Sequence, residues 1–413
     1  MQDEIFHIPQ AQEYCMGHVT SWDTKITTFP GVYVVSALAH GLVEGIVSGG
    51  SRIFDDSTLC SSLFLRGVTL VLGWACIYVI HGIVCHNGLQ KNQLLQTILC
   101  AMFPLHAFFV HLYYTDTAST LFVLSTWLAL LKKQYSLSGL LSACSILMRQ
   151  TNAVWIVYFV GAELYHMATE RYRGQSSDVV ILVRFLIRDF RAYIGKIWIH
   201  TLSVVAFALF VLHNGGVVLG DKEHHVPVTH WAQPLYFYAF LVLTSAPLWL
   251  HTRYHAPSLW TGMGLLCLAF LAVRMGTLVH PFILADNRHY TFYIWRKVLG
   301  ATIYSTYYMV PLYAMTAWLS IFSAPSRPTL QSMMLLACTA MVLIPAHLVE
   351  FRYFTIPWYI YMLDEHSVMY QTGSKGRIVL TIVGYLLVNT ITMYVFLYKP
   401  FLWPDGSIAR FMW

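Results

Sequence analysis

Two adjacent carboxylates, Asp3 and Glu4, stand near the start of the chain, and His7 follows four residues after Asp3. Residues four apart share one face of a helix, so a helical start would place Asp3 and His7 together. Partial desolvation beside a membrane raises the pKa of a carboxylate towards neutrality, where the group can act as a general base. The pattern therefore indicates proton transfer, although a solvated N-terminal cap would use the same residues.

Asp116 is a further candidate carboxylate, and it follows Tyr113-Tyr114-Thr115 at the edge of an apolar run. Tyrosine pairs at such edges are commonly interfacial anchors. Asp116 is compatible with two roles, the orientation of a substrate or the N-cap of the next helix.

Arg149 interrupts another apolar run, within the segment Arg149-Gln150-Thr151-Asn152. A cation inside an apolar segment is energetically expensive, so an accidental arginine is disfavoured there. Arg149 is therefore a candidate for holding a lipid phosphate.

The segments Asp286–Tyr290 and Glu350–Tyr353 combine titratable and aromatic side chains between apolar runs. Aromatic rings interleaved with Arg and His suit the stacking of a sugar and the binding of a phosphate. The alternative is an interfacial aromatic belt with charges that only set the topology, and Arg352 would then snorkel to head groups.

Neither a metal nor a cofactor is expected. Acidic and histidine residues do gather at 221–230, but without a fixed ligand spacing. The eight cysteines are scattered and form no CxxC pair, so neither a disulfide framework nor a zinc site is predicted. No P-loop, dinucleotide fingerprint, zinc-protease helix or nucleophile elbow is present.

The composition is that of an all-α polytopic membrane protein. Of the 413 residues, 57% are hydrophobic and only 11% are charged, against roughly a quarter charged in a soluble domain. The net charge of +6 is spread over loops, so we interpret it as a topology signal and expect no nucleic-acid partner.

Apolar runs predict about ten to twelve membrane elements. Pro30–Val47 is either a span or a helix on the membrane surface, and Gly139–Tyr165 is split by Arg149–Asn152 into two short spans or a re-entrant hairpin. The clear spans are Gly67–Cys85, Leu94–Tyr114, Thr117–Leu131, Ile197–Asn214, Pro234–Leu250, Ser258–Val279, Ala301–Phe322, Thr329–Val349 and Ile378–Tyr398. With no large hydrophilic stretch, residues 1–413 are predicted to form a single membrane domain.

Positive charge orients these spans. The segment 166–196 holds six Lys and Arg residues against three acids, so the positive-inside rule places it in the cytosol. Counting outwards puts the polar segments with candidate chemistry on the opposite side. These are Tyr113–Asp116, Arg149–Asn152, Asn214–His230, His280–Lys297 and Glu350–Tyr353.

Motifs along the whole chain resemble one family. They are Asp3–Gln12, Trp22-Asp23, Ile26–Thr28, Tyr113–Thr115, Arg149–Asn152, Asn214–Gly216, Gly220-Asp221, Leu284–Tyr293, Glu350–Phe354 and Arg410–Trp413. In this order they resemble the dolichyl-phosphate-glucose-dependent α-1,2-glucosyltransferases of N-glycan precursor assembly. Two departures are that Thr24 stands where the family usually has proline, and that a first span of the family is expected to be missing from this form.

The resemblance implies a GT-C-like multi-span helical bundle in the endoplasmic reticulum membrane, with luminal catalytic loops. The implied reaction transfers glucose from dolichyl phosphate glucose to the diglucosylated dolichyl-diphosphate oligosaccharide. It inverts the anomeric centre and forms the terminal α-1,2 linkage. Besides these two substrates, only membrane lipids are expected as partners.

Roles for the candidate residues follow from that reaction. Asp3 is the predicted general base, with Glu4 and Asp116 orienting the acceptor sugar. Arg288, His289 and Arg352, with Arg149 as a weaker candidate, would hold the phosphate, and Trp22 and Tyr290 would stack on sugar. The remaining predicted substrate-binding residues are His7, Asp23, Gln150, Asn152, Asp286, Asn287 and Glu350.

Three alternatives stay open at this point. A dolichyl-phosphate-mannose-dependent GT-C relative needs the same acid and cations. A transporter would show paired broken helices and midplane ionisable groups, but the one interrupted run here has no obvious counterpart. The chain could also be a catalytically inactive partner of other membrane proteins.

Overall fold

The structure is a computed structural model that describes residues 4–48, 60–87, 92–172, 177–223, 225–250, 256–322, 329–371, 374–403 and 406–413. The chain divides into two compact units. Unit 1 comprises Met1–Gly82 and His106–His225, and unit 2 comprises Ile83–Leu105 and Val226–Trp413. The single membrane domain remains a prediction.

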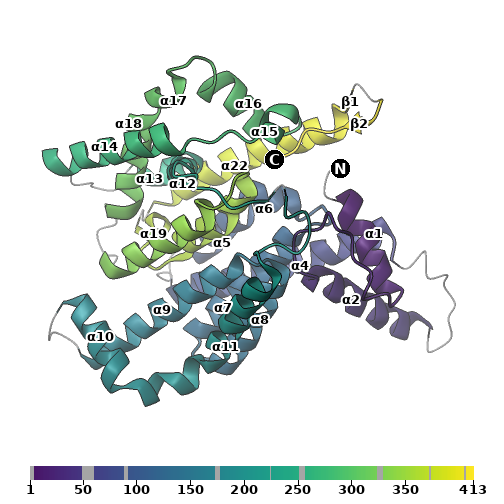
Figure 1. Ribbon diagram of the computed structural model, residues 1–413, viewed down its shortest axis with the longest axis horizontal. Helices are drawn as coiled ribbons and strands as arrows, with labels where there is room; N and C mark the ends of the chain where they lie inside the picture. Colours follow the sequence, from purple (N-terminus) through teal and green to yellow (C-terminus); the bar gives the residue numbers. More distant parts are fainter. Residues whose placement is uncertain are drawn as a thin grey trace. The chain divides into compact units, whose positions relative to one another are not determined.

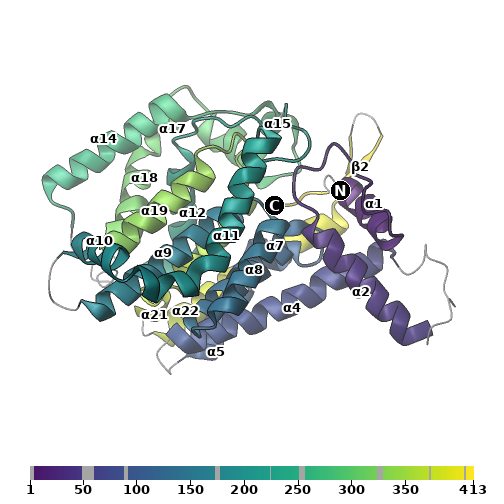
Figure 2. The same cartoon turned by 60° about the horizontal axis from the view of Figure 1, so that its bottom comes forward.

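Unit 1 is built from helices. In it α1 packs beside α2, while α7, α8, α9 and α11 pack against one another (Figures 1 and 2). Its helices are α1 Glu4–Cys15, α2 Gly31–Ser48, α4 Ser62–Asn87 (as far as Gly82), α6 Pro104–Phe109 (from His106), α7 Thr115–Leu131, α8 Tyr135–Met148, α9 Asn152–Arg171, α10 Asp178–Arg188 and α11 Phe190–Asn214.

Unit 2 contains many short helices besides the long α14 and α22, and its described residues include one small hairpin, in which β1 pairs antiparallel with β2. Within it α18 packs against both α12 and α14 (Figure 2). Its elements are α5 Gln93–Ala101, α12 Gln233–Thr244, α13 Ala246–Trp249, α14 Leu259–Gly276, α15 Pro281–Ala285, α16 Tyr290–Ile294, the π-helical turn Trp295–Leu299, α17 Ser305–Tyr308, α18 Val310–Ala317, the π-helical turn Trp318–Phe322, α19 Thr329–Leu343, the 3-10 turn Phe351–Phe354, α20 Thr355–Leu363, α21 Val368–Gln371, α22 Lys375–Tyr398, β1 Phe401–Leu402 and β2 Ile408–Ala409.

The prediction of a multi-span helical membrane protein is confirmed. Within the described ranges, four helices are long and apolar enough to cross a bilayer, namely Ser62–Asn87, Arg191–Asn214, Leu259–Gly276 and Lys375–Tyr398. Shorter apolar helices of 10–17 residues, including α7, α8 and α12, accompany them. Since α8 ends at Met148 and α9 begins at Asn152, the predicted break at Arg149–Asn152 is also confirmed.

Three predicted spans are wrong as continuous helices. Leu94–Tyr114 is broken between α5 and α6, Pro234–Leu250 between α12 and α13, and Ala301–Phe322 between α17 and α18. A proline stands in the first turn of each second helix, Pro104 in α6, Pro247 in α13 and Pro311 in α18. Proline has no N–H to continue the preceding helix and is favoured in a first helical turn, so each run of hydrophobic residues is divided into more than one helix.

The loop after α11 is tied to the segment that follows α1. Leu219, Gly220 and Asp221 donate backbone hydrogen bonds to the carbonyls of Thr27, Ile26 and Thr24, at 3.0, 3.1 and 2.9 Å. A Cβ on Gly220 would lie 2.2 Å from the Thr24 oxygen, so only glycine allows this approach. Two polar segments far apart in sequence therefore meet within unit 1.

The prediction that no disulfide is present is wrong. Cys15, the last residue of α1, is bonded to Cys60, which lies just before α4, with 6.5 Å between their Cα atoms. Gln12 reinforces the link by donating from Nε2 to the Cys60 carbonyl at 3.1 Å. Counting pairs and spacings missed this bond because only folding brings two cysteines 45 residues apart together.

Replacement of either bridged cysteine by serine is expected to loosen α1 from α4. The free energy of unfolding should fall by about 2–4 kcal/mol, because the disulfide restricts the unfolded chain. Thermal unfolding of the purified protein in detergent measures the loss. Cys15→Ser, Cys60→Ser and the double variant should show the same decrease, and Cys267→Ser, at an exposed free thiol, should show none. Additive losses in the double variant would contradict the bridge.

Candidate functional site

Glu4 is a buried carboxylate at the first residue of α1, with a side chain only 3% exposed. Arg66 of α4 donates to it through Nε at 3.0 Å and Nη2 at 2.8 Å, and the backbone N–H of Tyr113 donates to the same carboxylate at 2.7 Å. Charge-assisted bidentate pairing and a backbone donor compensate the desolvation of the acid. Glu4 therefore fastens α1 both to α4 and to the segment that leads into α7.

Asp116 lies in the first turn of α7 and is paired with Arg149, the residue that caps α8. The Arg149 Nη1 to Asp116 Oδ1 distance is 2.6 Å, and the two side chains are 17% and 7% exposed. An acid in the first turn and a base at a helix C-terminus are both favoured by the helix dipoles. Tyr114, and not Asp116, occupies the N-cap position of α7, so the alternative N-cap role is wrong.

The turn between α8 and α9 directs two amides inward. Gln150 donates from Nε2 to the Thr27 carbonyl at 2.8 Å. Asn152 donates from Nδ2 to the Ser119 hydroxyl at 2.8 Å and to the Ser145 carbonyl at 2.7 Å. Both predicted substrate-binding residues thus hold the polar end of unit 1 together, and Asn152 is fully buried.

The predicted residues of the N-terminal segment gather around Tyr33 of α2. His7 hydrogen-bonds to the Tyr33 hydroxyl through Nδ1, and the Trp22 ring meets the Tyr33 ring edge-on at 5.9 Å. The Asp23 carboxylate accepts a hydrogen bond from the backbone N–H of Lys25 at 2.9 Å. The backbone N–H of Asp23 donates to the Gln10 side-chain oxygen at 2.8 Å. Asp3, the predicted general base, lies outside the described residues.

Unit 2 contains the other predicted cluster. Arg288 donates to Asp286 through Nε and Nη2, each at 2.8 Å, and its own backbone N–H also donates to this carboxylate at 3.0 Å. His289 lies 3.4 Å from Asp286 through Nε2. The predicted phosphate ligand Arg288 is therefore already paired with a carboxylate of its own loop.

Opposed effects act on the two titrating groups of this cluster. Burial would raise the pKa of Asp286, but the hydrogen bonds from Arg288 and His289 outweigh it and hold that pKa well below its usual value. Burial likewise disfavours the charged His289, but the hydrogen bond and charge of Asp286 prevail and raise its pKa. The His289–Asp286 contact therefore favours a protonated imidazole.

The C-terminal segment packs onto this loop. His289 donates from Nδ1 to the Trp413 carbonyl at 2.7 Å, and the Met412 N–H donates to the Arg288 carbonyl at 2.8 Å. The Arg288 guanidinium lies 4.3 Å from the centroid of the Trp403 ring, whose Nε1 donates to Asn287 at 3.3 Å. Aromatic rings and backbone bonds thus fix the orientation of the Asp286–Tyr290 loop.

Tyr290 and the Glu350–Arg352 pair complete the cluster. The Tyr290 ring lies 4.6 Å from the Phe411 ring, edge-on, and 4.4 Å from the tilted Trp413 ring, measured between ring centroids, so it already packs against rings of the protein. Arg352 donates from Nε to Glu350 at 2.9 Å, and its Nη2 lies 2.6 Å from the same carboxylate. Glu350 also contributes to raising the pKa of His289, which relates this pair to the Asp286 loop.

Three residues of these clusters were not predicted from the sequence, namely Arg66, Trp403 and Trp413. Arg66 stands in the apolar run before Gly67, the same signal that singled out Arg149, but the predicted span began one residue too late. Trp403 left no local signal, since aromatic residues are frequent throughout this chain. Trp413 belongs to the motif Arg410–Trp413, to which no role at the site was assigned. At 221–230, Asp221 faces His225 at 3.5 Å, and no group of three potential metal ligands occurs among the described residues.

These features define a multi-span membrane protein in which four acidic side chains, Glu4, Asp116, Asp286 and Glu350, are paired with arginines. Comparison with known proteins identifies its family. Residues 1–363 match the model of the DIE2/ALG10 family, and the chain belongs to this family. It is 33% identical over 485 residues to the Dol-P-Glc:Glc(2)Man(9)GlcNAc(2)-PP-Dol alpha-1,2-glucosyltransferase of Arabidopsis thaliana, covering all of this chain and 94% of that protein. Proteins of the same name from Homo sapiens and Rattus norvegicus are 32% and 33% identical, over all of this chain and 92% of each. No solved structure matches significantly.

Removing the arginine from the Glu4 pair is expected to destabilise unit 1. Arg66→Met leaves a buried carboxylate without its cation, which costs about 3 kcal/mol and lowers the melting temperature in detergent. The double variant Glu4→Gln/Arg66→Met should recover much of this loss, because glutamine still accepts the Tyr113 N–H. Arg274→Met, at an exposed arginine of α14, is the matched control. Equal losses in the single and double variants would contradict the pairing.

The His289 contact is expected to make stability depend on pH. The pKa of His289 is raised in the folded protein, so its contribution is complete below the unfolded value of about 6.5 and is lost as the pH rises through the folded value. Melting temperatures of wild type and His289→Gln should therefore differ more at pH 6 than at pH 9. His86→Gln, at an exposed histidine of α4, is the matched control. A difference that widens towards pH 9 would overturn the assignment.

Proposed function

We propose that this chain transfers glucose from dolichyl phosphate glucose to the diglucosylated dolichyl-diphosphate oligosaccharide, forming the terminal α-1,2 linkage. The full-length likeness to three glucosyltransferases carries this proposal, since all of this chain aligns with each of them. The site predicted from sequence supports it, because the described candidate residues gather in two polar clusters at helix ends.

The proposed reaction needs one base and a stabilised leaving group. The acceptor hydroxyl gives its proton to the Asp3 carboxylate while its oxygen attacks the anomeric carbon of glucose. The bond from that carbon to the phosphate oxygen breaks, and dolichyl phosphate leaves. Attack opposite the leaving group inverts the anomeric centre.

Within this proposal, Glu4 and Asp116 orient the acceptor and do not take its proton. Each is nearly buried and bound to its own arginine, Arg66 and Arg149, so neither is available as a free base. Their pairs hold the Tyr113–Asp116 segment and the α8–α9 turn in place. Asp3 directly precedes the anchored Glu4 in the chain, which favours Asp3 as the base.

The Asp286 loop and the Glu350–Arg352 pair are proposed to bind the phosphate of the donor. With His289 protonated, the side chains of this cluster have three cations, Arg288, His289 and Arg352, against two carboxylates, Asp286 and Glu350. Guanidinium and imidazolium donors stabilise negative charge that develops on a departing phosphate. The phosphate in the donor is a monoanionic diester, and we propose that these cations suffice without an essential metal.

We place the enzyme in the endoplasmic reticulum membrane with its polar clusters on the luminal side. Positive-inside counting supports this orientation. The Cys15–Cys60 disulfide supports it independently, because disulfides form and persist in oxidising compartments such as this lumen. α1 and the start of α4 then face the lumen.

Expression in cells that lack the endogenous terminal glucosyltransferase tests the function. The wild-type chain should convert the two-glucose lipid-linked oligosaccharide to the three-glucose form, measured by chromatography of the released glycans. Asp3→Asn should lower this conversion by at least about 100-fold, the usual contribution of a general base. Glu13→Gln, at a partly exposed acid of α1 outside both polar clusters, should leave it unchanged.

Three outcomes decide against parts of the proposal. Full activity of Asp3→Asn would remove Asp3 as the base. No conversion by a wild-type chain that is folded and resident in the endoplasmic reticulum would favour the inactive-partner alternative, and transfer of mannose would favour the mannosyltransferase relative.

A further inference from the structure

The helix α10, Asp178–Arg188, has two apolar sides, and protein covers only one of them. Ile181 and Phe185 are buried in a core cluster with residues of α9 and α11, which includes Ala168 and Ile197. On the opposite side, four aliphatic residues are largely exposed, with exposed fractions of 57%, 47%, 48% and 74% for Val179, Val180, Val183 and Ile187.

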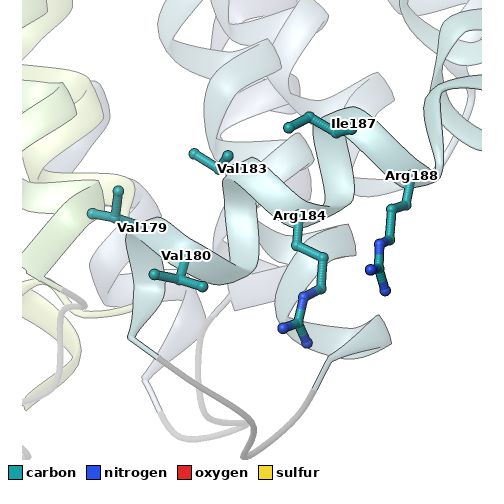
Figure 3. A pocket seen from close by; sticks show the side chains of 6 residues that line it. All are labelled: Val179, Val180, Val183, Arg184, Ile187 and Arg188. Carbon is teal, nitrogen blue, oxygen red and sulfur yellow. The ribbon is translucent and has the colours of Figure 1, made fainter.

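Two arginines border this exposed apolar face. Arg184 and Arg188, one helical turn apart, extend side by side from one edge of α10 (Figure 3). Together with the four aliphatic residues they line an open hollow of about 340 Å³. An aliphatic strip beside a row of arginines is the pattern of a helix that lies in the interface of a membrane.

The position of α10 in the chain places this exposed face near the surface of the bilayer. Only Asp189 and Phe190 separate α10 from the candidate span Arg191–Asn214. Twenty-four helical residues extend about 36 Å, so this span is only slightly longer than the hydrocarbon core of roughly 30 Å. The C-terminal end of α10 therefore lies within a few residues of the level where the span leaves the membrane.

Contacts in the C-terminal half of α10 and just beyond its end hold the helix in this position. Tyr193 of α11 donates to the Leu186 carbonyl at 2.8 Å. Tyr172, beyond the end of α9, donates to Asp189 at 2.6 Å, and its ring lies 5.7 Å from the Arg184 guanidinium. α10 is thus fixed to α9 and α11 with its aliphatic side turned away from them.

We propose that α10 is an interfacial helix that docks onto a bilayer containing anionic phospholipid. Val179, Val180, Val183 and Ile187 enter the outer acyl region, and Arg184 and Arg188 bind phosphate oxygens of the head groups. Positive charge favours anionic lipid over zwitterionic lipid at this level of the membrane. This inference is independent of the proposed transfer reaction, because it concerns a surface outside both polar clusters.

The test uses the full-length protein in nanodiscs of phosphatidylcholine, with and without added phosphatidylserine. An environment-sensitive fluorescent amino acid is placed at Val183 and, in a second variant, at Ile187. Leu209, an exposed residue within the α11 span, is the lipid-embedded control, and Glu223, an exposed loop residue, is the water control.

Emission from positions 183 and 187 should shift to the blue and should be quenched by lipids with brominated acyl chains, as at position 209. Added phosphatidylserine should increase the quenching, and Arg184→Gln/Arg188→Gln should abolish that increase. Emission like that of position 223, without quenching, would overturn the proposal. The exposed apolar face of α10 would then be a candidate surface for a protein partner. Equal quenching with and without phosphatidylserine in the arginine-containing protein would refute the anionic-lipid preference.

Discussion

A carboxylate removed from water needs a cation or several hydrogen-bond donors, and Glu4 has both in Arg66 and the Tyr113 N–H. In a chain with only 11% charged residues, this requirement governs where acids can stand. It is met repeatedly, by Asp116 with Arg149, by Asp286 with Arg288 and by Glu350 with Arg352. Each pair joins a helix end or a connecting segment to its surroundings, so the charges also organise the polar ends of the helices.

This pairing changes how the acidic residues are understood. A carboxylate paired with an arginine is a good anchor and a poor proton acceptor, because the adjacent cation stabilises its charged form. Glu4 and Asp116 therefore suit the positioning of other groups. Proton transfer then requires a carboxylate outside these pairs. Asp3, which directly precedes Glu4 in the chain, is the candidate.

The Asp286 loop obeys the same constraint through different contacts. Its arginine is paired within the loop, stacks on Trp403 and shares a backbone bond with Met412. The cations proposed to bind phosphate are thus oriented before any ligand arrives, which reduces the cost of reorganisation during transfer. A loop held by carboxylate, aromatic ring and backbone together is more precisely placed than one held by packing alone.

The sequence by itself determined the membrane class, the helical break at Arg149–Asn152 and the family, because apolar run length, an arginine in an apolar run and ordered motifs are local signals. It also named most of the side chains that gather in the two clusters. Only the tertiary structure decided their partners: Arg66 lies 62 residues from Glu4, and Trp413 lies 124 residues from His289. The tertiary structure also decided the Cys15–Cys60 disulfide and left the aliphatic side of α10 exposed. Pairings between residues so far apart in the sequence depend on how the helices pack. A local pattern of residues does not specify which distant side chain will contact a given acid or histidine.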